Sequence, residues 1–216
     1  MSARPESRKI LRFGLTERVY HWAQALPYLV LLGSGGLLLI QRQAQHEFIA
    51  APALILVHKV AGLMLPVLLL LVFLLGDRRT LLGNLWDALS WPGRALIGLA
   101  GSAISCLIPF RGEPPTKFNA GQKFHMLLLM VLIATFFCSG LYIWLAPGAL
   151  LSWYVHVAAF LVAAPLLGGH LFLALVHPVK RKGLSGMFTG RVDANWARDE
   201  SGEPPEAGPR RPGRPS

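Results

Sequence analysis

The sequence predicts an all-α integral membrane protein, a bundle of four transmembrane helices with both termini in the cytoplasm. Hydrophobic residues make up 53% of the 216 residues and charged residues only 15%, whereas an ordinary soluble domain carries about 25% charged residues. The mean hydropathy is +0.47. The basic residues, which give a formal net charge of +10, lie between the apolar blocks. Such a composition excludes intrinsic disorder for most of the chain.

The first two apolar blocks predict the first two spans. No charged residue lies between Arg18 and Arg42, and a helix of that length crosses a hydrocarbon core of roughly 30 Å. The first block is not a cleaved signal peptide, because its apolar core is long and no A-x-A-like site follows it. The second block, 48–76, is interrupted only by Lys59. We expect spans at 19–41 and 52–76.

The third apolar block predicts two further spans. Residues 124–179 contain no Asp, Glu, Lys or Arg, which is too long for one helix across a bilayer. Ala146-Pro147-Gly148-Ala149 supplies a turn within it. We therefore expect spans at 122–145 and 152–177.

Two other segments complete the domain organisation. Residues 95–110 are uncharged but short for a span, and a fifth span would move one set of basic loops outside. We interpret them as an interfacial or partner-packing helix within a loop, 77–121. Residues 201–216 are rich in Pro, Gly and Arg and predict a disordered tail. The rest, 1–200, is expected to be one four-helix domain, and no internal repeat is apparent.

The distribution of basic residues predicts the orientation. They precede the first span, lie between the second and third, and follow the fourth, whereas the other two loops hold Arg42 alone. The positive-inside rule then places both termini and loop 77–121 in the cytoplasm. Membrane topology thus accounts for the positive charge, and we expect lipid rather than nucleic acid as a partner.

Histidines within the spans are the candidate functional residues. Intramembrane ionisable residues are costly and usually functional. The alternating direction of the spans places His21 and His170 near the inner face, and His58 and His156 near the outer face. His156 and His170 are 14 positions apart, so they project from one helix face about 21 Å apart. The sequence predicts two bis-histidine metal sites, one at each depth.

The donor set indicates the kind of metal centre. Two imidazoles without a carboxylate or thiolate suit a six-coordinate haem iron, whereas zinc takes four protein ligands, or three and water. Cys106 and Cys138 form no CxxC, which excludes c-type haem attachment, a zinc ribbon and an iron–sulfur cluster of the chain's own.

Alternatives remain for several residues. For any single one of these histidines, the alternative is an ordinary role in packing between helices. His125 and His177 compete for the inner site. His177 shares the face of His170 but suits an exposed interfacial position, and His125 is a further candidate for contact with a haem propionate or a quinone. Arg12, Arg18 and Lys59 are candidates for pairing with propionates. The glycines near the histidines, Gly35 among them, serve either haem clearance or close helix packing.

Four stretches resemble the cytochrome b (gamma) subunit of membrane-bound formate dehydrogenase. The stretch 12–22 reads RFGLTERVYHW and is similar to its opening motif, and HKVAG at 58–62 is similar to its second span. KFNAGQK at 117–123 and GMFTGRV at 186–192, with Trp196-Ala197-Arg198, resemble the start of its third span and its C-terminal segment. The similarity covers about residues 8–200. The first motif and the four spans are shared with other bacterial di-haem cytochromes b.

The resemblance implies a function in a respiratory complex of the bacterial inner membrane. It implies two b haems, an outer one that receives electrons from an iron–sulfur subunit and an inner one that passes them to menaquinone or ubiquinone. A molybdenum or tungsten subunit would oxidise formate, so no catalytic residue is expected in this chain. Asn119 and Gly121, with Gln122 as a weaker candidate, would line the quinone pocket beside His170. Asn119 also suits a helix N-cap.

Two rival functions remain open from the sequence. The nearer is a cytochrome b membrane anchor of a nickel–iron hydrogenase or of another molybdoenzyme such as thiosulfate reductase. The more distant is a haem-free transporter or assembly anchor, although the repeat symmetry that many transporters have is not apparent here.

Overall fold

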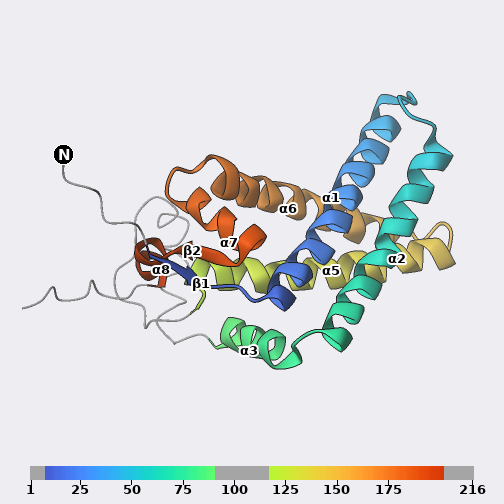
Figure 1. The fold of residues 1–216 in the computed structure, drawn as a ribbon. Helices are drawn as coiled ribbons and strands as arrows, with labels where there is room; N and C mark the ends of the chain where they lie inside the picture. Colours follow the sequence, from blue (N-terminus) through green and yellow to red (C-terminus); the bar gives the residue numbers. More distant parts are fainter. Residues whose placement is uncertain (1–7, 91–116, 202–216) are drawn as a thin grey trace, which may run out of the picture.

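Four long helices form two antiparallel hairpins (Figure 1), in a computed structural model that describes residues 8–90 and 117–201. In the first hairpin α1 (Leu15–Ala44) packs along α2 (Ala51–Leu75), and in the second α5 (Ala120–Leu145) packs along α6 (Leu150–Leu171). The last helix continues as a π-helical turn, η1 (Phe172–Val176). The two hairpins cross one another rather than lying parallel.

The prediction of four transmembrane helices is confirmed. All four helices are long and apolar enough to cross a membrane, the last one counted through Val176. Their bounds lie within four residues of the predicted spans at every described end. The largest differences are in α1, which begins at Leu15 instead of 19 and ends at Ala44 instead of 41. The helix includes the polar residues that flank the apolar block, since helical hydrogen bonding continues into the interfacial region.

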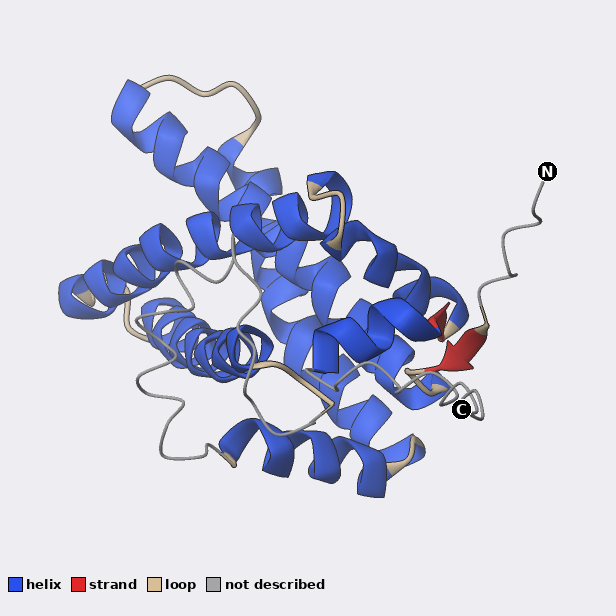
Figure 2. Ribbon diagram, turned by 90° about the vertical axis from the view of Figure 1, so that its left-hand side faces the viewer, coloured by secondary structure: helices blue, strands red, loops and turns tan. Residues whose placement is uncertain are grey.

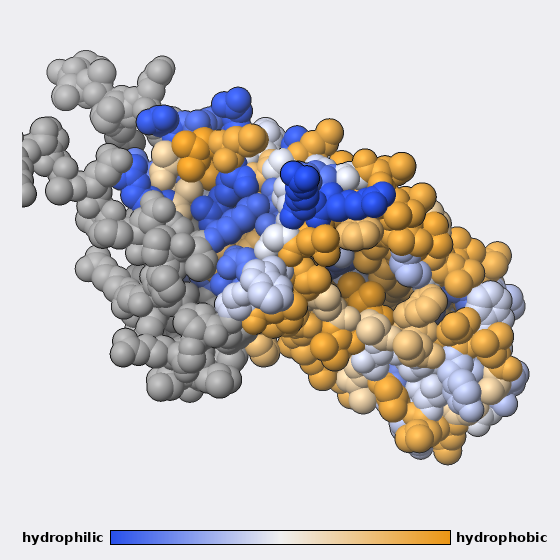
Figure 3. Space-filling model, turned by 90° about the horizontal axis from the view of Figure 1, so that it is seen from below, coloured by the Kyte–Doolittle hydropathy of each residue, from blue (hydrophilic) through white to orange (hydrophobic). Residues whose placement is uncertain are grey.

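The core of the bundle is narrow and draws on all four helices. Its buried side chains are Tyr28 and Leu32 of α1, Leu65 of α2, Leu132 of α5, and Ala159 and Ala163 of α6. Most of the large apolar side chains on these helices are instead exposed. On the face drawn in Figure 3, apolar surface covers the helices away from the grey residues. Exposed apolar surface of this extent fits contact with lipid.

Short elements gather at the end of the bundle where α1 and α5 begin (Figure 1). They are α3 (Arg78–Leu89), η2 (Lys180–Gly183), α7 (Leu184–Thr189) and α8 (Ala194–Ser201). Two strands, β1 (Lys9–Leu11) and β2 (Arg191–Asp193), pair antiparallel with Ile10 opposite Val192 (Figure 2). We did not predict this sheet or α3. We call this end of the molecule the polar end.

Two predictions concern segments that the structure does not describe. The expected interfacial helix at 95–110 lies outside the described residues. The expected tail at 201–216 also lies outside them, except for Ser201, which is the last residue of α8.

Candidate functional site

The four predicted histidines meet as two pairs between the hairpins. His58 of α2 and His156 of α6 have ring centres 6.1 Å apart. His21 of α1 and His170 of α6 have ring centres 6.4 Å apart. The second pair lies toward the polar end and the first toward the hairpin loops, as the sequence predicted from depth. We call them the polar-end pair and the loop-end pair.

The ring spacing fits one metal ion between the members of each pair. A metal–imidazole bond is about 2.0–2.1 Å and the ring centre lies roughly 1.2 Å behind its nitrogen, so two rings on opposite sides of a metal have centres about 6.4 Å apart. The observed 6.1 and 6.4 Å agree with that figure. Among the described residues, no group of three or more His, Cys, Asp or Glu could hold a metal ion. Pairs of imidazoles without further ligands fit haem iron better than zinc.

His125 of α5 is a third histidine at the polar end, but it does not duplicate the polar-end pair. Its ring stacks on that of His170 with centres 4.9 Å apart and an interplanar angle of 16°. This separation is shorter than the roughly 6.4 Å that a shared metal requires. His125 therefore suits a role beside the pair rather than within it. His177 has another function, because its Nδ1 accepts hydrogen bonds from the backbone N–H groups of Val179 and Lys180.

A serine–glycine step on the neighbouring helix faces each histidine of the loop-end pair. Ser34 Oγ lies 2.8 Å from His58 Nδ1, and Ser139 Oγ lies 2.8 Å from His156 Nδ1. A Cβ built on the glycine that follows each serine would lie 3.1 Å from His58 Cε1 or 3.2 Å from His156 Cε1. The lack of a side chain on Gly35 and Gly140 thus leaves room for the rings.

Sequence reasoning found only part of this arrangement. It singled out Gly35 for its depth but missed Gly140 and both serines. The available signal was the dipeptide Ser-Gly. It occurs in the first helix of each predicted hairpin, at the depth of a histidine in the second helix of the same hairpin.

The predicted quinone residues lie at the beginning of α5. Asn119 is the N-cap, and its side-chain oxygen accepts a hydrogen bond from Gln122 N–H at 2.9 Å. In return, Gln122 Oε1 accepts one from Asn119 N–H at 3.2 Å. This reciprocal pair is a capping box, so the alternative reading of Asn119 as an N-cap is confirmed. Quinone binding by these residues, with Gly121, stays a prediction.

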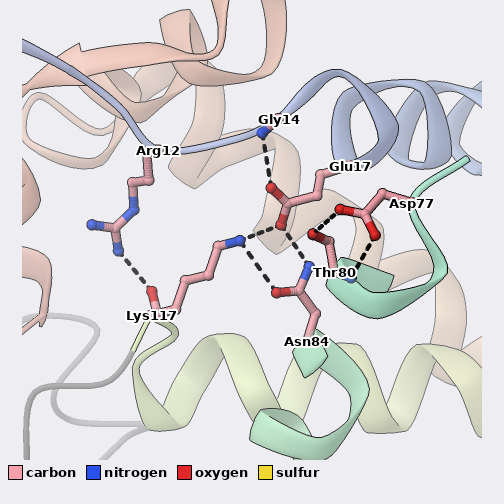
Figure 4. A network of polar contacts seen from close by, with 7 residues as sticks. All are labelled: Arg12, Gly14, Glu17, Asp77, Thr80, Asn84 and Lys117. Carbon is pink, nitrogen blue, oxygen red and sulfur yellow. Dashed lines mark hydrogen bonds and ion pairs between the residues drawn. The ribbon is translucent and has the colours of Figure 1, made fainter. Parts of the chain in front are cut away.

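A polar network ties the beginning of α1 to α3 and to the residues before α5 (Figure 4). Glu17 accepts hydrogen bonds from Gly14 N–H and Asn84 Nδ2, and forms an ion pair with Lys117 Nζ. Lys117 Nζ also donates to Asn84 Oδ1. The Glu17 side chain is only 8% exposed, so the charge of Lys117 compensates a largely buried carboxylate.

The opening stretch, residues 12–22, holds the C-terminal segment by hydrogen bonds to main-chain carbonyl groups. Arg12 N–H and Phe13 N–H both donate to the carbonyl of Gly190. Arg18 Nη1 donates to the Phe188 carbonyl at 2.6 Å, and Trp22 Nε1 to the Met187 carbonyl at 3.1 Å. Arg12 further donates to the carbonyls of Ala197 and Lys117. The side chains of Arg12 and Arg18 thus serve the fold of the polar end, whatever further contacts they make.

Comparison with known protein families identifies the family of this chain. A sequence model of the family described as prokaryotic cytochrome b561 matches residues 12–190, more than four fifths of the chain. The matched region contains all four spans, both histidine pairs and α7. No curated protein matches the chain.

Proposed function

We propose that this chain, which belongs to the prokaryotic cytochrome b561 family of membrane di-haem electron-transfer cytochromes, is the cytochrome b subunit of a respiratory formate dehydrogenase. In this proposal, it carries electrons from a periplasm-side iron–sulfur partner across the membrane to quinone. Members of the family bind haem b and anchor respiratory oxidoreductases in the membrane. The formate partner is supported by the resemblance at residues 117–123 and 186–198.

The observation that carries the proposal is the pairing of the histidines at two depths. His58 and His156 would hold one haem and His21 and His170 the other, and each haem iron, when bound, accepts and releases one electron at a time. His21 and Ser34 lie 13 positions apart on α1, about 20 Å along the helix. The chain itself therefore spaces the two proposed redox sites across the apolar part of the bundle.

A haem count on the purified chain tests the two sites. We expect two b haems per chain by pyridine haemochrome assay and a reduced-minus-oxidised spectrum. His58→Ala should lose the loop-end haem and His170→Ala the polar-end haem, each leaving the other in place. His177→Ala is the matched control and should retain both. Folded protein without haem would overturn the proposed function.

The identity of the partner needs a second experiment. Membrane vesicles that contain the chain and its native partners should show reduction of the b haems by formate but not by hydrogen. His170→Ala vesicles should keep formate-dependent reduction of the loop-end haem and lose quinone reduction. Reduction by hydrogen instead would identify a nickel–iron hydrogenase as the partner and overturn the formate assignment while leaving the cytochrome function in place.

We further propose that Asn119, Gly121 and Gln122 line the quinone site beside His170. The support is the resemblance together with their place at the N-cap and first turn of α5, three to six residues before His125. Asn119→Asp separates the two roles of this residue, because aspartate also caps helices well. If Asn119 binds quinone, this variant keeps the melting temperature but loses quinone reduction. If the residue only caps α5, both properties remain unchanged.

A further inference from the structure

Two serines, one on each hairpin, hydrogen-bond to the two histidines of the loop-end pair. We propose that Ser34 and Ser139 are positioning residues, which fix the Nδ1–H tautomer of His58 and His156 and make both imidazoles more basic ligands. The proposal rests on the haem sites proposed above. It assigns a function to two side chains that the sequence analysis did not single out.

The proton positions follow from the hydrogen-bond partners of each serine. Ser34 Oγ lies 2.6 Å from the Val30 carbonyl oxygen and Ser139 Oγ 2.5 Å from the Thr135 carbonyl oxygen. A carbonyl oxygen only accepts, and a hydroxyl has a single proton to donate. Each serine therefore donates to the carbonyl one turn earlier, and its oxygen accepts from the imidazole. The bonded Nδ1 carries the hydrogen in both histidines, which leaves the lone pair of Nε2 for a metal.

The glycine beside each serine sets the distance of the ring. The Cβ that either glycine lacks would lie 3.6 Å from the Nδ1 and 3.1–3.2 Å from the Cε1 of its histidine. The same edge of the ring thus faces the same dipeptide in both hairpins. A side chain at Gly35 or Gly140 would push the ring away from the serine. The glycine thus permits the close approach that the hydrogen bond to the serine requires.

The polar-end pair lacks this arrangement at one of its members. His21 Nδ1 is buried and has no hydrogen-bond partner within the part of the chain that the structure describes. A metal-bound imidazole that donates its second N–H to an acceptor is a more basic ligand. A more basic ligand stabilises the oxidised metal and lowers its reduction potential. The serines would therefore lower the potential of the loop-end haem, the direction that favours electron flow toward the polar end.

Isosteric substitutions test the role of the hydroxyl. Threonine and valine have nearly the same shape, and only threonine can accept the imidazole hydrogen. In the purified full-length chain, Ser139→Val should raise the potential of the loop-end haem, shift its low-spin EPR signal and weaken haem retention there by about 10- to 100-fold. Ser139→Thr should restore all three. We expect the same for the Val and Thr variants of Ser34, and the polar-end haem should be unchanged in all of them.

Thr135→Val is the matched control. Thr135 Oγ1 donates to the Val131 carbonyl at 2.8 Å, which is the same bond to the preceding turn of α5, but within the described residues no hydrogen bond joins this hydroxyl to a histidine. This variant should leave both potentials and both EPR signals as they are. A shift as large as that of Ser139→Val would show that the effect comes from helix packing and would overturn the proposal.

Two other results would also overturn it. Unchanged potential and EPR signal of the loop-end haem in both valine variants would show that the hydroxyls do not act on the ligands. Failure of threonine to restore what valine removes would exclude the hydrogen bond as the cause. These results are distinct from a failure of the proposed function, in which the unmodified chain would contain no haem at all.

Discussion

Gly190 closes α7 with a backbone conformation that side chains rarely adopt. Its φ is 79°, and a Cβ at this position would lie 2.6 Å from the carbonyl oxygen of Phe13. Gly148, in the turn between α5 and α6, has φ 92° but no atom within 4 Å of its missing Cβ. A side chain at Gly148 would therefore meet backbone strain alone, whereas a side chain at Gly190 would meet both backbone strain and steric overlap.

We predict that alanine at these two positions has unequal effects on stability. Gly148→Ala should lower the free energy of unfolding by about 1–2 kcal/mol, the cost of the left-handed conformation. Gly190→Ala should cost about 1–3 kcal/mol more because the extra methyl group overlaps the backbone of Phe13. Thermal unfolding in detergent measures both. Equal melting temperatures for the two variants would contradict the close approach of α7 to residue 13.

Asp77, the N-cap of α3, gives a pH dependence at the polar end. The hydroxyl and N–H of Thr80 and the N–H of Arg79 donate to its carboxylate, and these bonds, the Thr80 hydroxyl first, hold its pKa below the ordinary 3.8. A carboxyl whose pKa is lower in the folded state stabilises the fold above its unfolded pKa. This contribution is lost as the pH falls through the folded pKa.

As the pH is lowered below about 4, the melting temperature of the wild-type chain should therefore decrease more steeply than that of Asp77→Asn. Asparagine caps helices as well as aspartate does but does not titrate. Above about pH 5 the difference between the two proteins should be constant. Parallel curves down to pH 3 would mean that Asp77 contributes nothing to the pH dependence.

The paired histidines were predictable because their position in an apolar span made them unusual. An imidazole in an apolar span is costly, so the four paired histidines could be found from the sequence and their depths from span direction. Ser34 and Ser139 gave no such signal, because a serine in an apolar helix usually bonds to its own preceding turn. Both do so here, and their bonds to histidines depend on which helices are neighbours.

Among the elements, α1, α3 and the residues before α5 are joined by the largely buried carboxylate of Glu17. The contacts come from Lys117 and Asn84, far away in the sequence. Removing only the lysine leaves a largely buried charge without its cation, which is more costly than removing both charges.

We predict that Lys117→Met lowers the free energy of unfolding by about 1–3 kcal/mol. The double variant Glu17→Gln/Lys117→Met should be more stable than Lys117→Met, with a coupling energy of about 0.5–3 kcal/mol. Chemical unfolding of the wild type, both single variants and the double variant completes the cycle. Additive effects would show that the ion pair contributes nothing beyond its separate side chains.

The arrangement of the elements brings together three of the four stretches quoted for the resemblance, although they lie far apart in the sequence. Residues 12–22, 117–123 and 186–192 come together at the polar end, where Arg12 bonds to the carbonyls of Lys117 and Gly190. The sheet within this region could not be predicted. Its strands have three residues each and lie near opposite ends of the chain, so neither carries a detectable alternating pattern.

At the scale of the whole molecule, the two hairpins determine which histidines lie at the same depth and can form a pair. Antiparallel spans joined by short loops were predictable from the apolar blocks, and they fixed the pairing of His58 with His156 and of His21 with His170. The crossing of the hairpins was not predictable. It depends on close contacts in the core, such as that of Gly36 with Phe160, where a Cβ would lie 3.2 Å from the ring.

The orientation of the bundle in the membrane stays a prediction, which the charge distribution supports. The loops 46–50 and 146–149 contain no Lys or Arg, whereas Lys180, Arg181 and Lys182 form η2 at the polar end. Short loops with lysine and arginine remain in the cytoplasm during insertion. We therefore expect the polar end, with both termini, to face the cytoplasm.

Reporter fusions measure this orientation directly. Alkaline phosphatase, which is active only outside the cytoplasm, should be active when fused after Glu47 or Gly148 and inactive after Ser201. Green fluorescent protein should give the opposite pattern. Since basic residues rather than the apolar helices set the direction, Lys180, Arg181 and Lys182 changed together to Gln should weaken the preference and raise phosphatase activity after Ser201. Activity at Ser201 in the unmodified chain would reverse the bundle, placing the serine-bound histidine pair toward the cytoplasm and requiring an electron donor on that side.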